Sequence, residues 1–398
     1  MLTILIIIAI VAVWMTLDLY FGKKAHLATL PPHKESPVRK SEAHFFSHGD
    51  KLFDHMFQHI DKARDHIHMN FYIFRDDSIG SKMLHKLKVK SREGVTVRLM
   101  VDWVGAKISH KERKALKAAG VILAYSHPPK FPYLFFSLNE RNHRKITIID
   151  GRMAYIGGYN VGDEYLGRDP KMGRWRDYHL FITGEAVGEL QKQFLKDWQG
   201  ASGVKVKESP ALYPKLKQGN LDIKIVPTDG AYVKEKMINL IKDANDSVFI
   251  GTPYFIPGHE LQNLLIDTAR KGINVHVLIP KYPDHPLVKD AAFPYVRSLI
   301  KAGVQVRQFY EGFYHSKVVI IDDEIIDIGT ANFDKRSFHL NHEINCIIHN
   351  DEWIRPVKEE ILKDFYESSE RITLKEANSR SFFERIKESF AKLVSPFM

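Results

Sequence analysis

The sequence predicts an α/β protein made of two tandem copies of one domain, each with a central mixed sheet, preceded by one transmembrane helix. Three observations support this prediction: an apolar run at the N-terminus, an alternation of apolar strands with amphipathic helices, and the recurrence of that order in the second half. With 398 residues, the chain is long enough for two domains with well-buried cores.

The apolar run, residues 2–21, is long enough to cross a bilayer. About 20 residues at about 1.5 Å each span about 30 Å, the thickness of the hydrocarbon core. Asp18 is the only charge in the run, and we expect it to reach the headgroups because it lies near one end. A cleaved signal peptide is the alternative, but no basic segment precedes the run and no small-residue cleavage site follows it. We therefore predict a membrane anchor over residues 1–22.

Basic residues follow the anchor and none precedes it; they are Lys23, Lys24, Lys34, Arg39 and Lys40. The positive-inside rule then predicts a single pass through the cell membrane, with the rest of the chain in the cytoplasm. The segment 23–41 is polar and contains three prolines, Pro31, Pro32 and Pro37, so we predict a tether.

The composition favours an anionic partner and a reducing compartment. Lys plus Arg number 58 and Asp plus Glu number 48, which gives a net charge of +10. Such a surface attracts nucleic acid, anionic lipid or phosphate esters, although solubility alone would also explain it. The single cysteine, Cys346, excludes an intrachain disulfide and argues against a zinc-thiolate site, and its apolar surroundings predict that it is buried.

The second half of the chain repeats the order of the first. The predicted strand at residues 247–255 corresponds to that at 66–74, and the run INVHVLIP corresponds to VTVRLMVD. The predicted boundaries are 42–200 and 220–368 for the two domains, 201–219 for a linker rich in glycine and proline, and 369–398 for an amphipathic C-terminal segment.

Both halves contain the same constellation, H-x-K-x4-D-x6-G-x2-N, at the same place in the repeat. The first copy is His143, Lys145, Asp150, Gly157 and Asn160, and the second is His315, Lys317, Asp322, Gly329 and Asn332. His and Lys at positions i and i+2 of a strand point to one face, so two such strands side by side present two imidazoles and two ammonium groups to one cleft. A phosphodiester needs a nucleophile, a proton donor and positive charge around its non-bridging oxygens, and this set supplies all three. The two aspartates have odd spacing, which predicts that they fix the turn after the strand.

The duplicated motif resembles the HKD signature of the phospholipase D superfamily, and the chain is similar to bacterial cardiolipin synthases within it. The supporting runs are RNHRKITIIDGRMAYIGGYNVGDEYLG, WRDYHLFITG, TPYFIP, GFYHSKVVIIDDEIIDIGTANFDKRSFHLNHEIN and the C-terminal SPFM. The resemblance covers residues 45–398 and implies two phospholipase D-like domains that need neither a metal nor another cofactor for the chemistry. It counts Asp150 and Asp322 as members of the catalytic set with His143, Lys145, His315 and Lys317.

The resemblance also implies an activity. A cardiolipin synthase transfers a phosphatidyl group between two phosphatidylglycerol molecules, releasing glycerol, through a phosphohistidine. Phospholipase D-type hydrolysis of phospholipids is the alternative, because no residue in the sequence distinguishes a lipid acceptor from water. The anchor argues against a nuclease and hence against nucleic acid as partner, and the intact double motif argues against a non-enzymatic binding protein. The expected partners are phosphatidylglycerol and anionic membrane lipid, and the sequence leaves the oligomeric state open.

Roles within the site follow from the family pattern. It makes His143 the nucleophile and His315 the acid, while Asn160 and Asn332 are expected to bind phosphate oxygens. Each histidine also needs a carboxylate to orient its ring. The acids that follow each motif are the candidates, so we predict that Asp177 orients the histidine of the first half and Glu343 that of the second.

Two further apolar segments point to a membrane. An insertion before the first motif contains Pro128, Pro129, Phe131, Pro132, Tyr133, Leu134, Phe135 and Phe136. It either dips toward acyl chains beside the active site or packs on its own core. A helical stripe near the C-terminus consists of Phe382, Phe383, Ile386, Phe390, Leu393, Val394 and Phe397. It either lies on an anionic membrane surface or closes the domain.

Overall fold

The structure is a computed structural model that describes residues 1–32, 34–285 and 287–395, so Phe397 and most of the SPFM run lie outside the described residues. The elements of the first half are α1 (Leu2–Thr29), β1 (Val38–Phe46), α2 (Gly49–Lys62), β2 (His66–Phe71), β3 (Phe74–Arg75), α3 (Ser78–Arg92), β4 (Thr96–Asp102), β5 (Ala106–Lys107), α4 (His110–Ala118), β6 (Ile122–Ser126), α5 (Leu134–Asn139), β7 (Ile146–Ile149), β8 (Met153–Gly157), the 3-10 helix η1 (Asp163–Leu166), β9 (Arg174–Arg176), β10 (His179–Gly184) and α6 (Ala186–Ser202).

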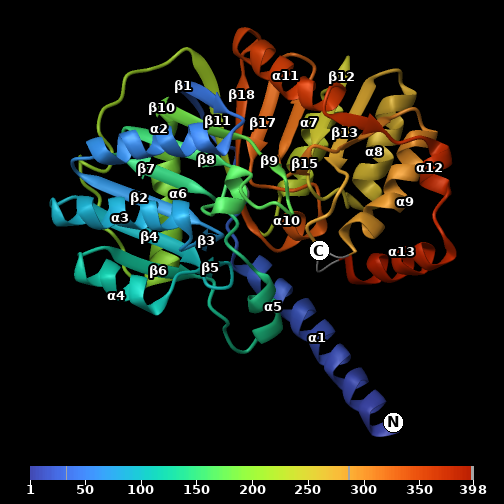
Figure 1. Ribbon diagram of the computed structural model, residues 1–398, viewed down its shortest axis with the longest axis horizontal. Coiled ribbons are helices and arrows are strands. Elements are labelled where there is room, and N and C mark those ends of the chain that lie inside the picture. Colours follow the sequence, from blue (N-terminus) through green and yellow to red (C-terminus); the bar gives the residue numbers. More distant parts are fainter. Residues whose placement is uncertain (33, 286, 396–398) are drawn as a thin grey trace.

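The second half follows in the same order (Figure 1). Its elements are β11 (Leu221–Asp229), α7 (Val233–Lys242), β12 (Ser247–Gly251), α8 (Gly258–Arg270), β13 (Asn274–Pro280), α9 (Val288–Lys301), β14 (Gln305–Phe309), β15 (Gly312–Tyr314), β16 (Val318–Ile321), β17 (Ile325–Gly329), α10 (Lys335–His339), β18 (His342–His349), α11 (Asp351–Tyr366), β19 (Ser369–Arg371), α12 (Leu374–Asn378) and α13 (Phe382–Val394). The duplicated α/β architecture predicted from the sequence is confirmed.

The two halves share one sheet. Its fifteen strands run in the order β19-β14-β13-β12-β16-β17-β18-β11-β1-β10-β8-β7-β2-β4-β6. Parallel pairs, such as β2 with β4 and β12 with β13, occupy the outer parts, and antiparallel pairs fill the middle, so the sheet is mixed. The central strand β1 pairs with β10 through residues 41–46 and with β11 through residues 38–41, which joins the halves.

Three apolar cores result from this arrangement. The central one is shared by both halves and lies under α6 and α11. Val187, Leu190, Phe194 and Trp198 recur on α6 at helical spacing, and this stripe faces the sheet. The second core lies under α2 and α3 of the first half and also takes in Phe313 of the second, and the third lies under α8 and α9 of the second half. Cys346 is buried in the central core, as predicted.

The predicted tether at 23–41 is wrong at both of its ends. Helix α1 continues to Thr29, and residues 38–41 belong to the central strand β1. Strand β1 can form there because two neighbouring strands supply hydrogen-bond partners for its backbone, which no local pattern reveals.

The end of α1 is packed against the protein, and this corrects the prediction for Asp18. Asp18 is buried, and its Oδ1 accepts a hydrogen bond of 2.8 Å from the backbone N–H of Phe136 instead of reaching headgroups. Gly22 permits the contact, because a Cβ at that position would lie 2.5 Å from the Cβ of Phe136. Residues 2–17 of α1 protrude from the body (Figure 1). Among the described residues, α1 is the one helix that is long and apolar enough to span a membrane.

The aromatic insertion and the C-terminal stripe have different environments. Phe136 of the insertion is buried against α1, whereas Phe131 is 85% exposed. The insertion therefore packs on α1 and not on a core of its own. Helix α13 packs on α9 with Ala391 and Glu388 turned inward. Its stripe faces outward, with Phe382 74% and Phe383 75% exposed.

Candidate active site

The two histidines of the duplicated motif line one pocket. His143 precedes β7 and His315 precedes β16, so each half contributes one imidazole from the start of an inner strand. The pocket has a volume of about 640 Å³. Both histidines are largely buried, and burial lowers the pKa of His143 to about 4 and that of His315 well below its ordinary value. Both rings are therefore neutral in the free protein at neutral pH.

Each histidine is held by a carboxylate from the opposite half, which corrects the pairing expected within halves. Nδ1 of His143 lies 2.8 Å from Oε2 and 3.1 Å from Oε1 of Glu343. Nδ1 of His315 lies 2.6 Å from Oδ2 of Asp177. Both carboxylates are fully buried, and Glu343 also accepts hydrogen bonds from the hydroxyls of Thr330 and Ser337.

Main-chain pairing between the halves explains why each histidine contacts the carboxylate of the opposite half. The backbone N–H of His143 donates to the carbonyl of His342, the residue before Glu343, at 2.9 Å. In the same way, the N–H of His315 donates to the carbonyl of Arg176, the residue before Asp177, at 2.7 Å. The segment before each histidine thus runs beside the segment before the acid of the other half, and β15 pairs in parallel with β9. The acid on that neighbouring segment is the one within reach of the ring.

A buried arginine adds to this connection. The guanidinium of Arg144 donates to the carbonyl of Glu343 at 3.0 Å and to that of Thr228 at 2.9 Å. It also forms ion pairs with Asp197 of its own half and Asp229 of the other. Arg144, which lies between the His and the Lys of the first motif, therefore links the two halves beside the pocket.

The two lysines of the motif lie behind the histidines. The ammonium of Lys145 donates to the carbonyl of His143 at 2.7 Å, and that of Lys317 donates to the carbonyl of His315 and lies 2.7 Å from Nδ1 of His315. Neither lysine is among the residues that line the pocket. Burial lowers the pKa of Lys145 to about 7 and that of Lys317 to about 8.

The aspartates of the motif lie away from the pocket, at the other end of the strands. Asp150 accepts hydrogen bonds from the backbone N–H groups of residues 64–66, and Asp322 accepts them from those of residues 245–247. Both have left-handed backbone conformations, with φ of 53°. The geometry agrees with the prediction that they fix the turn, and it places them outside the set of side chains that can touch a substrate.

The asparagines of the motif line the pocket. Oδ1 of Asn160 accepts a hydrogen bond of 3.0 Å from the N–H of Ile73, which turns its amide NH₂ group toward free space. Asn332 is 5% exposed, and its Oδ1 has no hydrogen-bond partner within the part of the chain that the structure describes. The position of Asn160 suits an amide that donates to a phosphate oxygen, whereas the unpartnered atom of Asn332 is an acceptor.

The sequence motif does not identify the other residues that line the pocket. Tyr72 follows β2 and Tyr254 follows β12, which are equivalent strands of the repeat, so comparison of the two halves could have found them. Further cations in the wall are Arg75, Arg141 and Arg336. Ring contacts fix the histidines from the side, since Tyr72 lies 5.1 Å from His143 and Trp175 lies 5.0 Å from His315, centroid to centroid.

The fold has solved relatives at low sequence identity. The phosphatidylserine synthase of Haemophilus influenzae Rd KW20 has a TM-score of 0.73, covering 95% of this chain and 100% of that chain at 14% identity. The polyphosphate kinase of Porphyromonas gingivalis has a TM-score of 0.58, covering 88% of this chain and 53% of that chain at 12% identity. These likenesses concern the fold. The class is shown by the family model, whose PLD-like domain matches both halves, so the chain is a phospholipase D-like protein.

The sequence comparisons narrow this class to one family. The family model described as cardiolipin synthase, PLD-like domain, matches residues 56–198 and 237–365. The minor cardiolipin synthase ClsB of Bacillus subtilis (strain 168) is 37% identical over 399 residues, 99% of this chain and 98% of the relative. The cardiolipin synthase of Oceanobacillus iheyensis is 40% identical over 358 residues, 89% of this chain and 74% of the relative. The chain belongs to the cardiolipin synthase family of PLD-like proteins, and α1 indicates that it is membrane-associated.

Proposed function

We propose that this protein transfers a phosphatidyl group from one phosphatidylglycerol to the free hydroxyl of another, forming cardiolipin and releasing glycerol. The observation that carries the proposal is the pair of motif histidines lining one pocket, each oriented by a buried carboxylate. Family membership supports the choice of a phosphatidyl transfer among the reactions that such a site can perform.

In the first step of the proposed reaction, Nε2 of His143 attacks phosphorus. Its Nδ1 faces the carboxylate of Glu343, which only accepts hydrogen bonds, so the ring proton sits on Nδ1 and Nε2 keeps its lone pair. A phosphorus–nitrogen bond forms, the phosphorus–oxygen bond to glycerol breaks, and His315 protonates the leaving oxygen. In the second step, His315 takes the proton from the incoming hydroxyl, whose oxygen displaces His143 and completes cardiolipin.

The acid role of His315 follows the family pattern, and its carboxylate suits that role. Oδ2 of Asp177 accepts hydrogen bonds only and lies 2.6 Å from Nδ1 of His315, so it stabilises the protonated ring, which presents its Nε2–H to the substrate. A bound phosphodiester also raises the pKa of a facing imidazole, because its negative charge stabilises the protonated form. Lys145 and Lys317 supply further positive charge from behind, and Asn160 and Asn332 bind the non-bridging oxygens.

Purified protein with phosphatidylglycerol as the only lipid tests whether the acceptor of the phosphatidyl group is a second lipid or water. We expect glycerol and cardiolipin to appear in equal amounts, with no product from the His143→Ala variant. Phosphatidic acid as the dominant product would establish the hydrolase instead. A chelator should leave the chemical step intact, because the proposed reaction uses no metal.

The histidine roles are tested with a substrate whose leaving group needs no proton. Substitution of either histidine by Ala should lower turnover of phosphatidylglycerol by several orders of magnitude. His315→Ala should still form a phosphohistidine with the activated substrate, and His143→Ala should form none. An adduct mapped by mass spectrometry to His315 would reverse the roles, and no adduct in any variant would indicate direct displacement.

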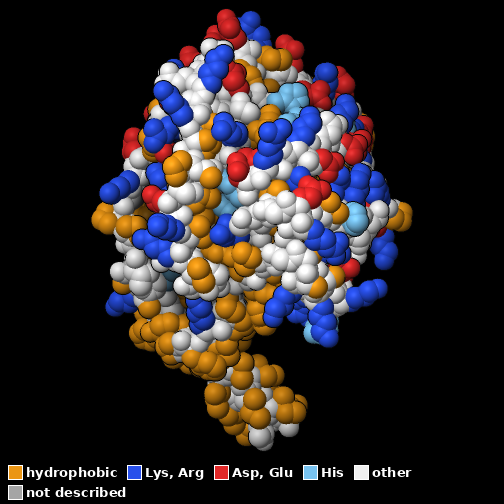
Figure 2. All heavy atoms as spheres, turned by 90° about the vertical axis from the view of Figure 1, so that its left-hand side faces the viewer, with side chains coloured by type: hydrophobic (Ala, Val, Ile, Leu, Met, Phe, Trp, Pro, Cys, Tyr) orange, Lys and Arg blue, Asp and Glu red, His pale blue; other side chains and the backbone are white. Residues whose placement is uncertain are grey.

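We further propose a single pass through the cell membrane, with both catalytic halves in the cytoplasm and α13 resting on the bilayer. The protruding residues 2–17 rise about 24 Å along the helix axis at about 1.5 Å per residue. This is less than the ~30 Å thickness of the hydrocarbon core of a bilayer, so a helix that spans the core brings the adjoining insertion, with Phe131, up to the headgroups. Hydrophobic side chains cover α1 and the body next to it (Figure 2). Helix α13 lies toward the same side, with exposed Arg385 and Lys387 beside its apolar stripe (Figure 1). A reporter at the C-terminus that scores as external would refute this topology.

A further inference from the structure

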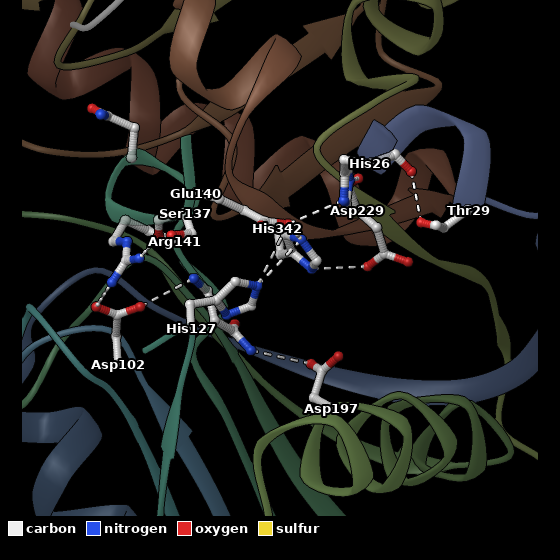
Figure 3. A network of polar contacts seen from close by, with 12 residues as sticks. His26, Thr29, Asp102, His127, Ser137, Glu140, Arg141, Asp197, Asp229 and His342 are labelled. Carbon is white, nitrogen blue, oxygen red and sulfur yellow. Dashed lines mark hydrogen bonds and ion pairs between the residues drawn. The ribbon is translucent and has the colours of Figure 1, made fainter. Parts of the chain in front are cut away.

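A second cluster of histidine and carboxylate side chains lies where α1 meets the catalytic halves (Figure 3). It consists of His26 on α1, His127 after β6, Glu140 after α5 and His342 at the start of β18. Three separate parts of the chain, the anchor helix, the insertion and a strand of the second half, thus direct side chains at one point. None of the four residues is among those that line the catalytic pocket, and the proposed reaction uses none of them.

The distances from Glu140 to the three histidines are close to those of a tetrahedral zinc site, although His127 falls outside the group whose ligand atoms all lie within 4.8 Å of one another. Oε1 of Glu140 lies 3.2 Å from Nδ1 of His26, 2.9 Å from Nε2 of His342 and 3.8 Å from Nε2 of His127. Nε2 of His127 lies 3.3 Å from Nε2 of His342. Ligand atoms about 2.0 Å from a zinc ion are about 3.3 Å apart in a tetrahedron. The ligand atoms of His26, Glu140 and His342 all lie within 4.8 Å of one another, so small side-chain rotations bring them onto one ion.

The outward-facing nitrogens of two of the imidazoles already have the partners that metal-bound histidines use. Nε2 of His26 lies 2.8 Å from the carbonyl oxygen of Asp229, and Nδ1 of His342 lies 3.3 Å from its carboxylate. A histidine that binds a metal through one nitrogen typically donates its other N–H to a carbonyl or carboxylate, which sets the ring orientation. The other nitrogen of each ring, Nδ1 of His26 and Nε2 of His342, is thereby turned toward Glu140.

His127 is not explained by hydrogen bonding alone. If Nε2 of His342 donates to Glu140 at 2.9 Å, that hydrogen is not available to Nε2 of His127. Nδ1 of His127 is buried without a partner among the described residues. Nε2 of His127 is the nitrogen turned toward Glu140 and His342, so it is placed to join an ion bound between them.

We propose that His26, His127, Glu140 and His342 bind one structural zinc ion that links the membrane helix to the catalytic core. Three imidazoles and one carboxylate suit zinc, whereas magnesium and calcium prefer oxygen ligands throughout. Four protein ligands leave no open position, which is the pattern of a structural site. The site adjoins the catalytic pocket through the main chain, since the carbonyl of His342 accepts from the N–H of His143.

The test uses the full-length protein in detergent, expressed in zinc-supplemented medium and dialysed without chelator. Mass spectrometry of the metal content should find one zinc per chain in the wild type and at least a tenfold loss in His26→Ala and in Glu140→Gln. The matched control His110→Ala, an exposed histidine on α4, should keep its zinc. Addition of ZnCl₂ after removal of the ion should raise the midpoint of thermal unfolding of the wild type and of the control, but not of the two variants.

Cobalt(II) chloride gives a second measurement on the wild type that depends on no variant. Tetrahedral cobalt absorbs strongly in the visible range, so its spectrum should appear with one equivalent and disappear when zinc is added. A wild-type protein that binds neither ion with a stoichiometry of one, or variants that retain zinc like the control, would overturn the proposal. Turnover of the zinc-free protein at low temperature separates this site from the reaction. Loss of turnover without unfolding would challenge the metal-free mechanism, whereas loss of thermal stability alone supports the structural role.

Discussion

At the scale of single residues, each catalytic histidine depends on a carboxylate from the other half of the chain. Glu343 and Asp177 are buried, and each faces Nδ1 of the histidine whose backbone is paired with its own strand segment. Neither half can therefore orient its own histidine, although each contains a complete copy of the motif. This dependence explains how two like motifs can hold two rings in different states, because each ring has a different carboxylate and a different set of cations around it.

The crossed pairing predicts crossed phenotypes. Asp177→Asn should behave like a defect in His315, losing about 10²- to 10⁴-fold in turnover of phosphatidylglycerol while still forming an adduct with the activated substrate. Glu343→Gln should behave like a defect in His143 and form little adduct with either substrate. Trapping of the phosphohistidine adduct, followed by mass spectrometry, distinguishes the two variants. If each carboxylate instead oriented the histidine of its own half, Asp177→Asn would form little adduct and Glu343→Gln would still form it.

The lysines predict the alkaline limb of the pH profile. Burial lowers the pKa of Lys145 to about 7 and that of Lys317 to about 8. Because a lysine is charged below its pKa, kcat/KM should fall in two steps as the pH rises through about 7 and then about 8. Lys317→Arg should move the upper step to higher pH, because arginine stays protonated throughout the range, at some cost in maximal rate. An upper step that stays in place in the Arg variant would assign it to another group.

At the scale of elements, the turn after β8 shows why the motif region contains two successive glycines. A Cβ on Gly157 would lie 2.5 Å from the Cα of His179, and one on Gly158 would lie 1.9 Å from Oδ1 of Asp177. The strand β8 and the segment before β10 thus approach too closely for any side chain. The approach positions the Asp177 carboxylate against His315, so backbone packing in the first half sets the geometry of a ring in the second.

Gly158→Ala should therefore damage both stability and the His315 function. The added methyl group must displace the Asp177 carboxylate or the backbone, and overpacking of this kind costs about 1–3 kcal/mol. Gly188→Ala in α6 is the matched control, since a Cβ there meets nothing within 4 Å and Ala favours a helix by up to about 1 kcal/mol. Denaturant unfolding should rank the control above wild type and Gly158→Ala below it. Equal stability of both variants would contradict the packing argument.

At the scale of the whole molecule, α13 lies on the same side of the body as the protruding part of α1 (Figure 1). Phe131 of the insertion and the outward stripe of α13 are both exposed. The inward side of α13 is polar, since Glu388 forms ion pairs with Arg297 and Arg380. An amphipathic helix with this orientation leaves its apolar stripe unpaired within the described chain. If α1 inserts into a bilayer, the apolar stripe of α13 can bind the surface of the same bilayer. The two contacts together would fix the orientation of the catalytic pocket relative to the membrane.

A protein that lacks the protruding part of α1 tests whether α13 contacts the membrane. Without residues 2–17, the protein should still bind vesicles containing phosphatidylglycerol, reversibly and more weakly at high salt. Adding Phe382→Ser and Phe383→Ser should abolish this binding, whereas Tyr366→Ser, which removes an exposed aromatic side chain at the end of α11, should not. Sedimentation with vesicles measures each case. Undiminished binding of the double variant would exclude α13 as a membrane contact.

The sequence by itself determined the features that depend on local pattern. Apolar length specifies α1, the recurrence of strands and helices specifies the duplicated fold, and the repeated motif identifies His143 and His315 as a pair. The expectation that His and Lys share one face of a strand is wrong, because residues 143–145 and 315–317 precede β7 and β16 and neither lysine lines the pocket. The odd spacing of Asp150 and Asp322 predicts that they lie in the turn, although the backbone N–H groups that they bind, those of residues 64–66 and 245–247, come from distant parts of the chain.

Only the tertiary structure decided which distant residues meet. His143 and Glu343 are 200 positions apart and His315 and Asp177 are 138 apart, and the two alternative pairings are equally compatible with the repeat. The choice follows from strand segments of opposite halves running side by side around β1, and the gathering of His26, His127, Glu140 and His342 follows from the same path of the chain. Local periodicity carries no information on such partners, because they are selected by the packing of the whole sheet.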